Sequence, residues 1–176
     1  IVLALISWPL FSREPQPRVA VLSLATPQDA DLQGLAEGIA EDASAALRAR
    51  GIEALARDSA SDTSREQAID RARGSGALFA LEGAIESADN GVRITIGVAR
   101  TSDRAVLWSE TEDGPAVAAA ALRQVAAARG VNALACAVRA GPTAPANAYP
   151  ELLSACAHAD DRDARGRNIE ALSQAV

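Results

Sequence analysis

The sequence has no lysine and no methionine, and it has a single histidine and only five aromatic residues among 176. One histidine excludes a two-histidine metal site and makes a histidine-dependent catalytic dyad hard to build. Because large side chains are scarce and alanine runs are frequent, we expect a core of small residues with closely packed helices and moderate stability. No other catalytic constellation is recognisable, so we predict no catalytic residue, no metal and no cofactor.

The charged residues are unbalanced in both number and type. All 17 basic residues are arginines, they face 23 acidic residues, and the formal net charge is -6. This balance disfavours a nucleic-acid or anionic-membrane surface on these residues. The exclusive use of arginine is more typical of a GC-rich coding sequence than of a binding role.

With 49% hydrophobic residues, the chain can bury one ordinary core, which indicates one domain with room for appendages.

Residues 77–110 form the most informative stretch. They contain three apolar runs separated by two short polar turns, which predicts a three-stranded antiparallel meander. Residues 92–98 alternate between apolar side chains and polar or small ones, so one face of this strand is suited to a core. Asn90-Gly91 supplies the positive backbone angles of a tight hairpin turn, and residues 101–104 make the second reversal.

The preceding segments complete an α/β pattern. Short buried strands are predicted at 18–25 and 52–57, and helices at 31–50 and 64–73. The right-handed crossover rule places the first and third strands side by side and parallel. We therefore predict an α/β fold with a mixed five-stranded sheet in the order 2-1-3-4-5, whose last two strands are antiparallel.

The segment after the meander is predicted to be helical. Residues 113–115 open a long alanine-rich helix that ends at about residue 139, with Gly130 as a kink or break. At residues 141–146 two prolines mark a change in composition, and residues 147–176 resemble two amphipathic helices. Thirty residues cannot bury two such helices alone, so this helical hairpin either docks on the domain or begins a helical array, which we favour.

The first eleven residues form an uncharged apolar run. They are too few to span a bilayer core, which needs about 20 residues, but they suit the outgoing half of a membrane helix. We expect residues 1–12 to end a transmembrane helix and residues 13–18 to form a linker. A signal-peptide core and a buried strand or helix of the soluble domain are the two alternatives.

Cys136 and Cys156 have two interpretations. In an exported chain, two cysteines favour a disulfide, which could form if the long helix folds back against the first tail helix. Such a bond would contribute about 3 kcal/mol by chain-entropy estimates. The alternative is two separate buried thiols.

Histidine and acidic residues cluster near the end of the tail. His158 is followed by Asp160, Asp161 and Asp163, which together could recruit a divalent ion. A solvated acidic turn is the interpretation that we favour.

Other candidate residues have structural explanations that we also favour. We expect Glu82 to be an exposed strand residue or the partner of an arginine, rather than a buried acid with a raised pKa. Trp108 and Phe79 are expected in the core, rather than as a ligand-stacking platform. The acidic residues of the first helix are expected on a solvated face: Glu37, Glu41 and Asp42.

Three motifs carry a resemblance to a known family. Residues 35–42 (LAEGIAED), Leu81-Glu82-Gly83 and Leu107-Trp108-Ser109-Glu110 resemble the helix and strand motifs of the TolB amino-terminal-like domain. The resemblance covers about residues 18–140 and marks a fold, not a reaction. The chain departs from the family at Ser23 and Leu24, where Pro-Phe is usual, and at Gly38, where some relatives carry threonine.

The resemblance implies a setting. Such domains often lie outside the cytoplasmic membrane in single-span regulators of the CadC type or in adenylate cyclases, before tetratricopeptide repeats. It implies a non-catalytic periplasmic sensory or protein-interaction domain, anchored in the inner membrane, acting in signal transduction or transcription regulation. Residues 141–176 would begin the repeats, the partner would be a protein or a second copy, and any activity would lie in a separate output domain.

Two other functions stay open at this point. The chain could be an exported envelope-assembly or lipoprotein-type factor of TolB-like fold. It could also be an enzyme with a modest pocket at the strand ends, the usual ligand position in open α/β sheets.

Overall fold

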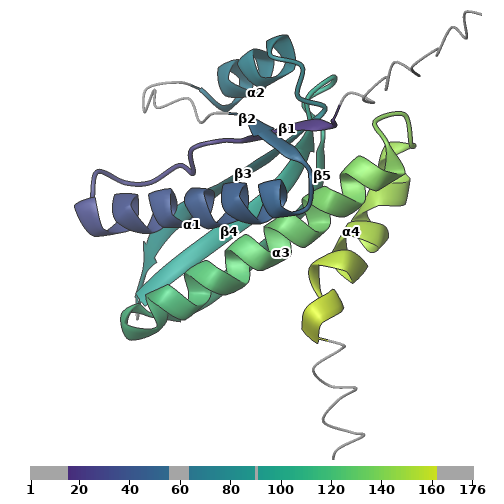
Figure 1. The fold of residues 1–176 in the computed structure, drawn as a ribbon. Helices are drawn as coiled ribbons and strands as arrows, with labels where there is room; N and C mark the ends of the chain where they lie inside the picture. Colours follow the sequence, from purple (N-terminus) through teal and green to yellow (C-terminus); the bar gives the residue numbers. More distant parts are fainter. Residues whose placement is uncertain (1–15, 56–63, 90, 162–176) are drawn as a thin grey trace, which may run out of the picture.

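The computed structural model describes residues 16–55, 64–89 and 91–161. Within them a five-stranded sheet has the order β2-β1-β3-β4-β5, which confirms the predicted mixed α/β fold. Helices α1 and α3 lie side by side across one face of the sheet, and α2 lies on the other face (Figure 1). The strands are β1 (Arg18–Val21), β2 (Glu53–Leu55), β3 (Phe79–Ala88), β4 (Gly91–Arg100) and β5 (Val106–Pro115). The α-helices are α1 (Ala30–Ala49), α2 (Arg65–Gly74), α3 (Ala119–Ala140) and α4 (Tyr149–Ala157).

Strand β1 lies between two parallel partners, β2 and β3. Its Val19, Ala20 and Val21 are buried, as expected for a strand covered on both faces. The strand ends at Val21, four residues earlier than predicted. The chain nevertheless stays beside β3, where Ala25 forms an isolated bridge with Ala84.

Side chains cap the first turn of each of the first two helices. The Asp29 carboxylate caps α1 by accepting hydrogen bonds from the backbone N–H groups of Asp31 and Leu32. Ser64 and Gln67 form a reciprocal capping box at the start of α2. These local hydrogen bonds satisfy N–H groups that have no partner within their helices.

The meander is confirmed, but its third strand is longer than predicted. Strands β3 and β4 pair antiparallel from Phe79↔Arg100 to Ala88↔Gly91. Strand β5 continues to Pro115, where a turn and helix start were predicted, because Asp113 pairs with Arg93 across the sheet. Proline has no backbone N–H group to donate to a neighbouring strand. An edge strand has no neighbour on one side, so it can end in proline.

Helix α3 runs without a break through Gly130, so the predicted kink is wrong. A Cβ at this position would lie 2.7 Å from Cδ1 of Ile96 and 2.9 Å from Cδ1 of Leu81. Glycine therefore lets the helix approach β3 and β4 closely, which is its role here.

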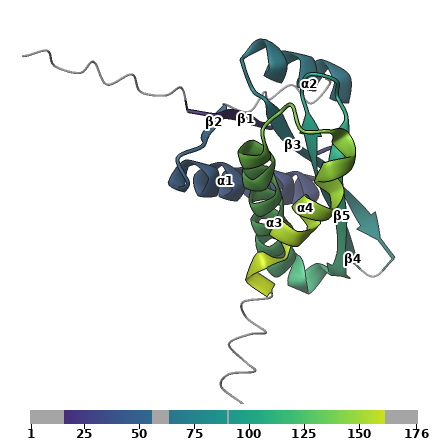
Figure 2. The same cartoon turned by 90° about the vertical axis from the view of Figure 1, so that its right-hand side faces the viewer.

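The tail was expected either to dock on the domain or to begin a helical array, and we favoured the array. The structure shows that α4 docks on the domain. The helix packs on α3 and β5 (Figure 2), and its Tyr149, Leu153 and Ala157 belong to the same buried cluster as the sheet. The Tyr149 ring meets Phe79 edge-on, with 6.2 Å between the ring centroids. Helices α3 and α4 therefore form a C-terminal hairpin, which is not the predicted one between two helices of residues 147–176.

Some expectations fall on residues outside the described part. These are the membrane-helix stub at residues 1–12, most of the linker at 13–18, and the second tail helix beyond residue 161. Asn90 of the predicted hairpin turn also lies outside it, and Gly91, with a φ of 156°, is the first residue of β4 and pairs with Ala88. Within the described residues, no helix is both long and apolar enough to cross a membrane.

Candidate functional site

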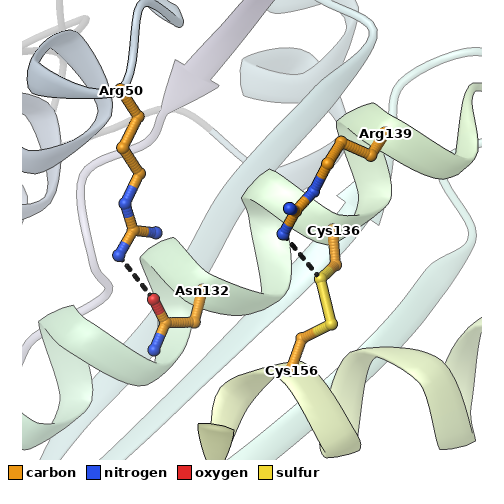
Figure 3. Close-up of a disulfide and its surroundings, with 5 residues drawn as sticks. All are labelled: Arg50, Asn132, Cys136, Arg139 and Cys156. Carbon is orange, nitrogen blue, oxygen red and sulfur yellow. Dashed lines mark hydrogen bonds between the residues drawn. A yellow bond between two sulfur atoms is a disulfide. The ribbon is translucent and has the colours of Figure 1, made fainter. Parts of the chain in front are cut away.

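Helix α4 is joined to α3 by a covalent bond. Cys136 of α3 and Cys156 of α4 form a disulfide, with their Cα atoms 6.5 Å apart (Figure 3). The bond closes a loop across a sequence separation of 20 residues. Cys136 is buried and Cys156 is half-buried, so the bond is also part of the packing between these helices.

A cleft lies beside this disulfide. Its volume is about 570 Å³, within the range of small-molecule sites. Its walls come from the ends of α1 and α3 and from α4, and the two cysteines are among its lining residues. Ile52, Ala135 and Val138 give it an apolar surface, and Arg50, Arg139, Asn132 and Asp160 add polar groups.

The polar side chains of the cleft are connected through Asn132. Its Oδ1 accepts a hydrogen bond of 2.6 Å from Arg50 Nη2, and its Nδ2 donates one of 3.0 Å to Asp160 Oδ2. Arg139 lies over the disulfide, with its Nη2 3.3 Å from Cys136 Sγ (Figure 3). The cleft therefore combines guanidinium groups with an apolar wall, a combination suited to an anion with an apolar body.

A second cluster of charged side chains joins β5, α3 and α4. The β5 register places Glu110 and Glu112 opposite Ile96 and Ile94, on the pleat that faces α3. Arg129 of α3 donates hydrogen bonds to both glutamates and to Asp161, which lies 3.1 Å from its Nη2. The two carboxylates on the core-facing side of this edge strand thus share one guanidinium as hydrogen-bond donor.

His158 belongs to this second cluster. Its Nδ1 lies 3.0 Å from Asp161 Oδ2 and its Nε2 lies 3.1 Å from Glu110 Oε2. The hydrogen bond from His158, followed by the contact with Arg129, lowers the pKa of Asp161. The half-buried histidine therefore helps to hold α4 against β5, so the predicted solvated turn is only partly right.

The alternative to the solvated turn, an ion site built from His158 and the aspartates, does not assemble within the described residues. Asp160 hydrogen-bonds to Asn132 instead of to the histidine cluster, and Asp163 lies outside the described part. No group of three or more potential metal ligands is found in the residues that the structure describes.

The fold-motif residues are structural. Leu81, Leu107 and Trp108 are buried, and the close approach of β3 to β4 leaves no room for a side chain at Gly83. Phe79 is fully buried, so both aromatic residues lie in the core as predicted.

Glu82 has the arginine partner that was one of its two expected roles. Its carboxylate accepts hydrogen bonds of 2.8 and 2.7 Å from Nε and Nη2 of Arg65. These bonds raise the pKa of Arg65. The Arg65 side chain is 39% exposed, but that of Glu82 is only 13% exposed, so the carboxylate is half-buried beneath its bidentate partner.

The acidic face of α1 is only partly solvated. Glu37 and Glu41 are exposed as predicted, but Asp42 forms an ion pair with Arg123 of α3. Gly38, one of the departures from the family motif, makes room for that arginine, because a Cβ there would lie 2.4 Å from Arg123 Nη1. The departure thus has a packing explanation between α1 and α3.

Comparison with known proteins gives structural neighbours only. No protein-family model and no curated protein matches the chain. A PelC dodecamer from Paraburkholderia phytofirmans has a TM-score of 0.48 and 24% identity, covering 66% of this chain and 85% of its own.

Two further neighbours are more distant in sequence. TolB from Acinetobacter baumannii has a TM-score of 0.46 and 15% identity over 71% of this chain and 29% of its own. The C-terminal domain of LpoB from Salmonella enterica has a TM-score of 0.41 and 16% identity over 55% of this chain and 82% of its own. All three TM-scores are below 0.5.

Sequence analysis found the two cysteines but missed the side chains around them. Arg50, Asn132 and Arg139 come from the ends and middle of two helices, and no spacing rule connects them. Glu110 was noticed only as part of a motif, and Arg129 was not singled out. One feature of the sequence could have indicated this cluster. Glu110 and Glu112 are two residues apart, so in a strand they lie on the same face, where they need a cation as partner.

Proposed function

We propose that this chain is a non-catalytic interaction domain that works outside the cytoplasm, in the bacterial periplasm. The observation that carries the proposal is the disulfide between Cys136 and Cys156. Disulfides form and persist in oxidising compartments and are rare in the cytosol. Here the bond fixes a helix whose buried residues complete the core, so an oxidising compartment favours the folded state.

The interaction surface in this proposal is the face of β3, β4 and β5 turned away from α1 and α3. Helix α2 covers only the end of this face that carries Ala80 and Ala99. The remainder carries exposed or half-exposed polar side chains: Glu86, Arg93, Thr95, Ser109, Thr111 and Asp113. A broad, rigid and polar sheet face is suited to a protein partner or a second copy.

The finer form of the proposal follows from the sequence. The apolar run at residues 1–11 and the TolB-like motifs favour the periplasmic part of a single-span signalling or transcription-regulatory protein of the inner membrane. Tetratricopeptide-like repeats would follow the domain. An exported envelope-assembly or lipoprotein-type factor is the alternative that the experiments below distinguish.

The compartment is tested by labelling one introduced cysteine in intact cells. Val117 is 95% exposed, so Val117→Cys in the full-length protein should react with a membrane-impermeant maleimide once the outer membrane is permeabilised. Ala43→Cys, at a fully buried position, is the matched control and should react only after denaturation. Labelling of Val117→Cys that requires lysis of the inner membrane would contradict the proposal.

The anchor and the partner need separate measurements. If the protein remains in the membrane fraction with residues 1–11 attached, the single-span form is supported; a mature chain without them supports the exported factor. Photo-cross-linking residues at Arg93 and Thr111 should then capture one defined partner or a second copy. The same group at Gln124, on the exposed side of α3, should not.

A further inference from the structure

The arginines of this protein fall into two groups. Most have a carboxylate partner at ion-pair distance: Arg18, Arg65, Arg73, Arg93, Arg100, Arg104, Arg123 and Arg129. Arg48, Arg50 and Arg139 have no such partner among the described residues, although the chain carries an excess of acidic residues. Of these three, Arg50 and Arg139 line the cleft beside the disulfide.

The contacts of these two arginines leave their charge unneutralised. Arg50 donates to the neutral amide oxygen of Asn132, and Arg139 donates to a cysteine sulfur, which is a weak acceptor. Asn132 also holds Asp160, the acidic residue of the cleft, through its Nδ2. The Asn132 amide therefore lies between Arg50 and the Asp160 carboxylate. Other N–H groups of the Arg50 guanidinium remain available to bind a ligand.

The remaining wall of the cleft is apolar. Ile52 follows α1, Ala135 and Val138 belong to α3, and the disulfide connects this wall to α4. A cleft with convergent donors and an apolar surface is the usual form of a site for a small ligand. The planar guanidinium groups match the oxygens of a carboxylate or a phosphate.

We propose that this cleft binds a small organic anion, with a carboxylate or phosphate group held by Arg50 and Arg139. The apolar part of the ligand lies against Ile52, Val138 and the disulfide. The position of Asn132, which is buried between its two partners, sets the orientation of Arg50. This inference is independent of the cellular role proposed above, because it concerns a different surface.

The test uses three probes that share one apolar chain. Hexanoate and hexyl phosphate carry the two candidate anionic groups, and hexanamide carries none. Binding to the oxidised protein is measured by calorimetry and by the chemical shifts of the arginine Nε–H groups. We expect saturable binding of at least one anion with shifts at Arg50 and Arg139, and the stronger probe identifies the anionic group. Hexanamide should bind about tenfold more weakly, because it lacks the charge-assisted hydrogen bonds.

The variants have a matched control at Arg48, in the last turn of α1 and two residues before Arg50. Arg50→Gln and Arg139→Gln should each weaken the preferred anion about tenfold. Arg48→Gln should leave the affinity unchanged, because Arg48 is exposed in the last turn of α1 and does not line the cleft. All three arginines are exposed, so circular dichroism should show that the variants fold.

Three results would overturn the inference. The first is the absence of saturation by either anion at millimolar concentrations. The second is equal binding of hexanamide, which would show an apolar site without anion recognition. The third is an equal loss of affinity in Arg48→Gln, which would show only a general effect of charge. The labelling experiment on Val117→Cys is unaffected by any of these results, so the two proposals fail separately.

Discussion

Gly83 lies where strands β3 and β4 approach too closely for a side chain. A Cβ at this position would lie 2.1 Å from the Thr95 carbonyl oxygen and 3.1 Å from the Ile96 Cα. Both are backbone atoms of the neighbouring strand, so the clash cannot be relieved by a rotamer change. A glycine in a family motif therefore has a steric explanation here.

We expect Gly83→Ala to lower the free energy of unfolding by about 1–3 kcal/mol, because the strands must separate locally. Gly34→Ala is the matched control, since nothing lies within 4 Å of a Cβ at that exposed position of α1. It should stabilise the protein by about 0.5–1 kcal/mol through helix propensity. Urea unfolding measures both; equal effects of the two substitutions would be inconsistent with the close approach of the strands.

Asp161 provides a prediction about pH. Its pKa is lowered by the hydrogen bond from His158 and by Arg129. A carboxyl whose pKa is lower in the folded state stabilises the fold above its unfolded pKa, and this contribution is lost as the pH falls through the folded value. Asp161→Asn should therefore lower stability at neutral pH, and the difference from the unsubstituted protein should disappear in acid.

The comparison with a neighbouring residue isolates that effect. Asp160→Asn removes the same charge from the same turn but keeps an oxygen that can accept from Asn132. It should cost less stability at neutral pH than Asp161→Asn. Chemical unfolding across the acid range measures both variants, and a gap for Asp161→Asn that does not change with pH would show that the contact with His158 is not electrostatic.

At the scale of elements, α4 distinguishes a docked helix from a separate array. Leu153 is fully buried in the core, whereas its neighbour Leu152 is 42% exposed. Leu153→Ala should cost about 2–5 kcal/mol, because it leaves a cavity beneath the helix. Leu152→Ala should change stability by less than about 0.5 kcal/mol. Thermal unfolding of the two variants compares them directly, and similar values would mean that α4 is not docked in solution.

Local signals and the crossover rule predicted the elements and the strand order, whereas long-range pairings between side chains were not predictable. The alternation of residues 92–98 and the Asn90-Gly91 pair identified a strand and a turn from neighbours in the chain. The end of β5 was missed because Glu112 and Asp113 look like a polar turn. Their partners Arg129 and Arg93 lie 17 and 20 residues away, where a local pattern gives no information.

The candidate site was predictable to a smaller extent. A disulfide between Cys136 and Cys156 was one of two alternatives, since it depended on how the tail packs. The cleft beside it could not be inferred, because Arg50, Asn132 and Arg139 meet only after α1, α3 and α4 are placed. Gly130 was predicted to kink or break α3. Its role in the close approach of α3 to the sheet could not be predicted, because the helix sequence does not determine the distance between the helix and the sheet.

Across the whole molecule, the two faces of the sheet have unequal cores. The face under α1, α3 and α4 holds a large buried cluster, and the face under α2 holds a small one of mostly alanines. Only two residues of α2, Ile69 and Ala72, are buried in this small cluster. Regions with few buried apolar contacts open at lower free energy than the rest of a protein.

We therefore expect α2 to open before the rest of the fold. In native-state hydrogen exchange, the amides of α2 should exchange at a lower opening free energy than those of α1 and α3. The amides of α4 should follow those of α3, because the disulfide joins the two helices. Equal protection of α2 and α1 would show that the small cluster is as stable as the large one.

The cross-link also determines how mechanical tension enters the fold. A pull on the chain beyond residue 161 reaches α3 through the sulfur–sulfur bond, and residues 137–155 lie inside the closed loop, where they carry no force. Any strain transmitted from that end therefore enters α3 at Cys136, about one turn before the helix ends at Ala140, rather than at the loop that follows it.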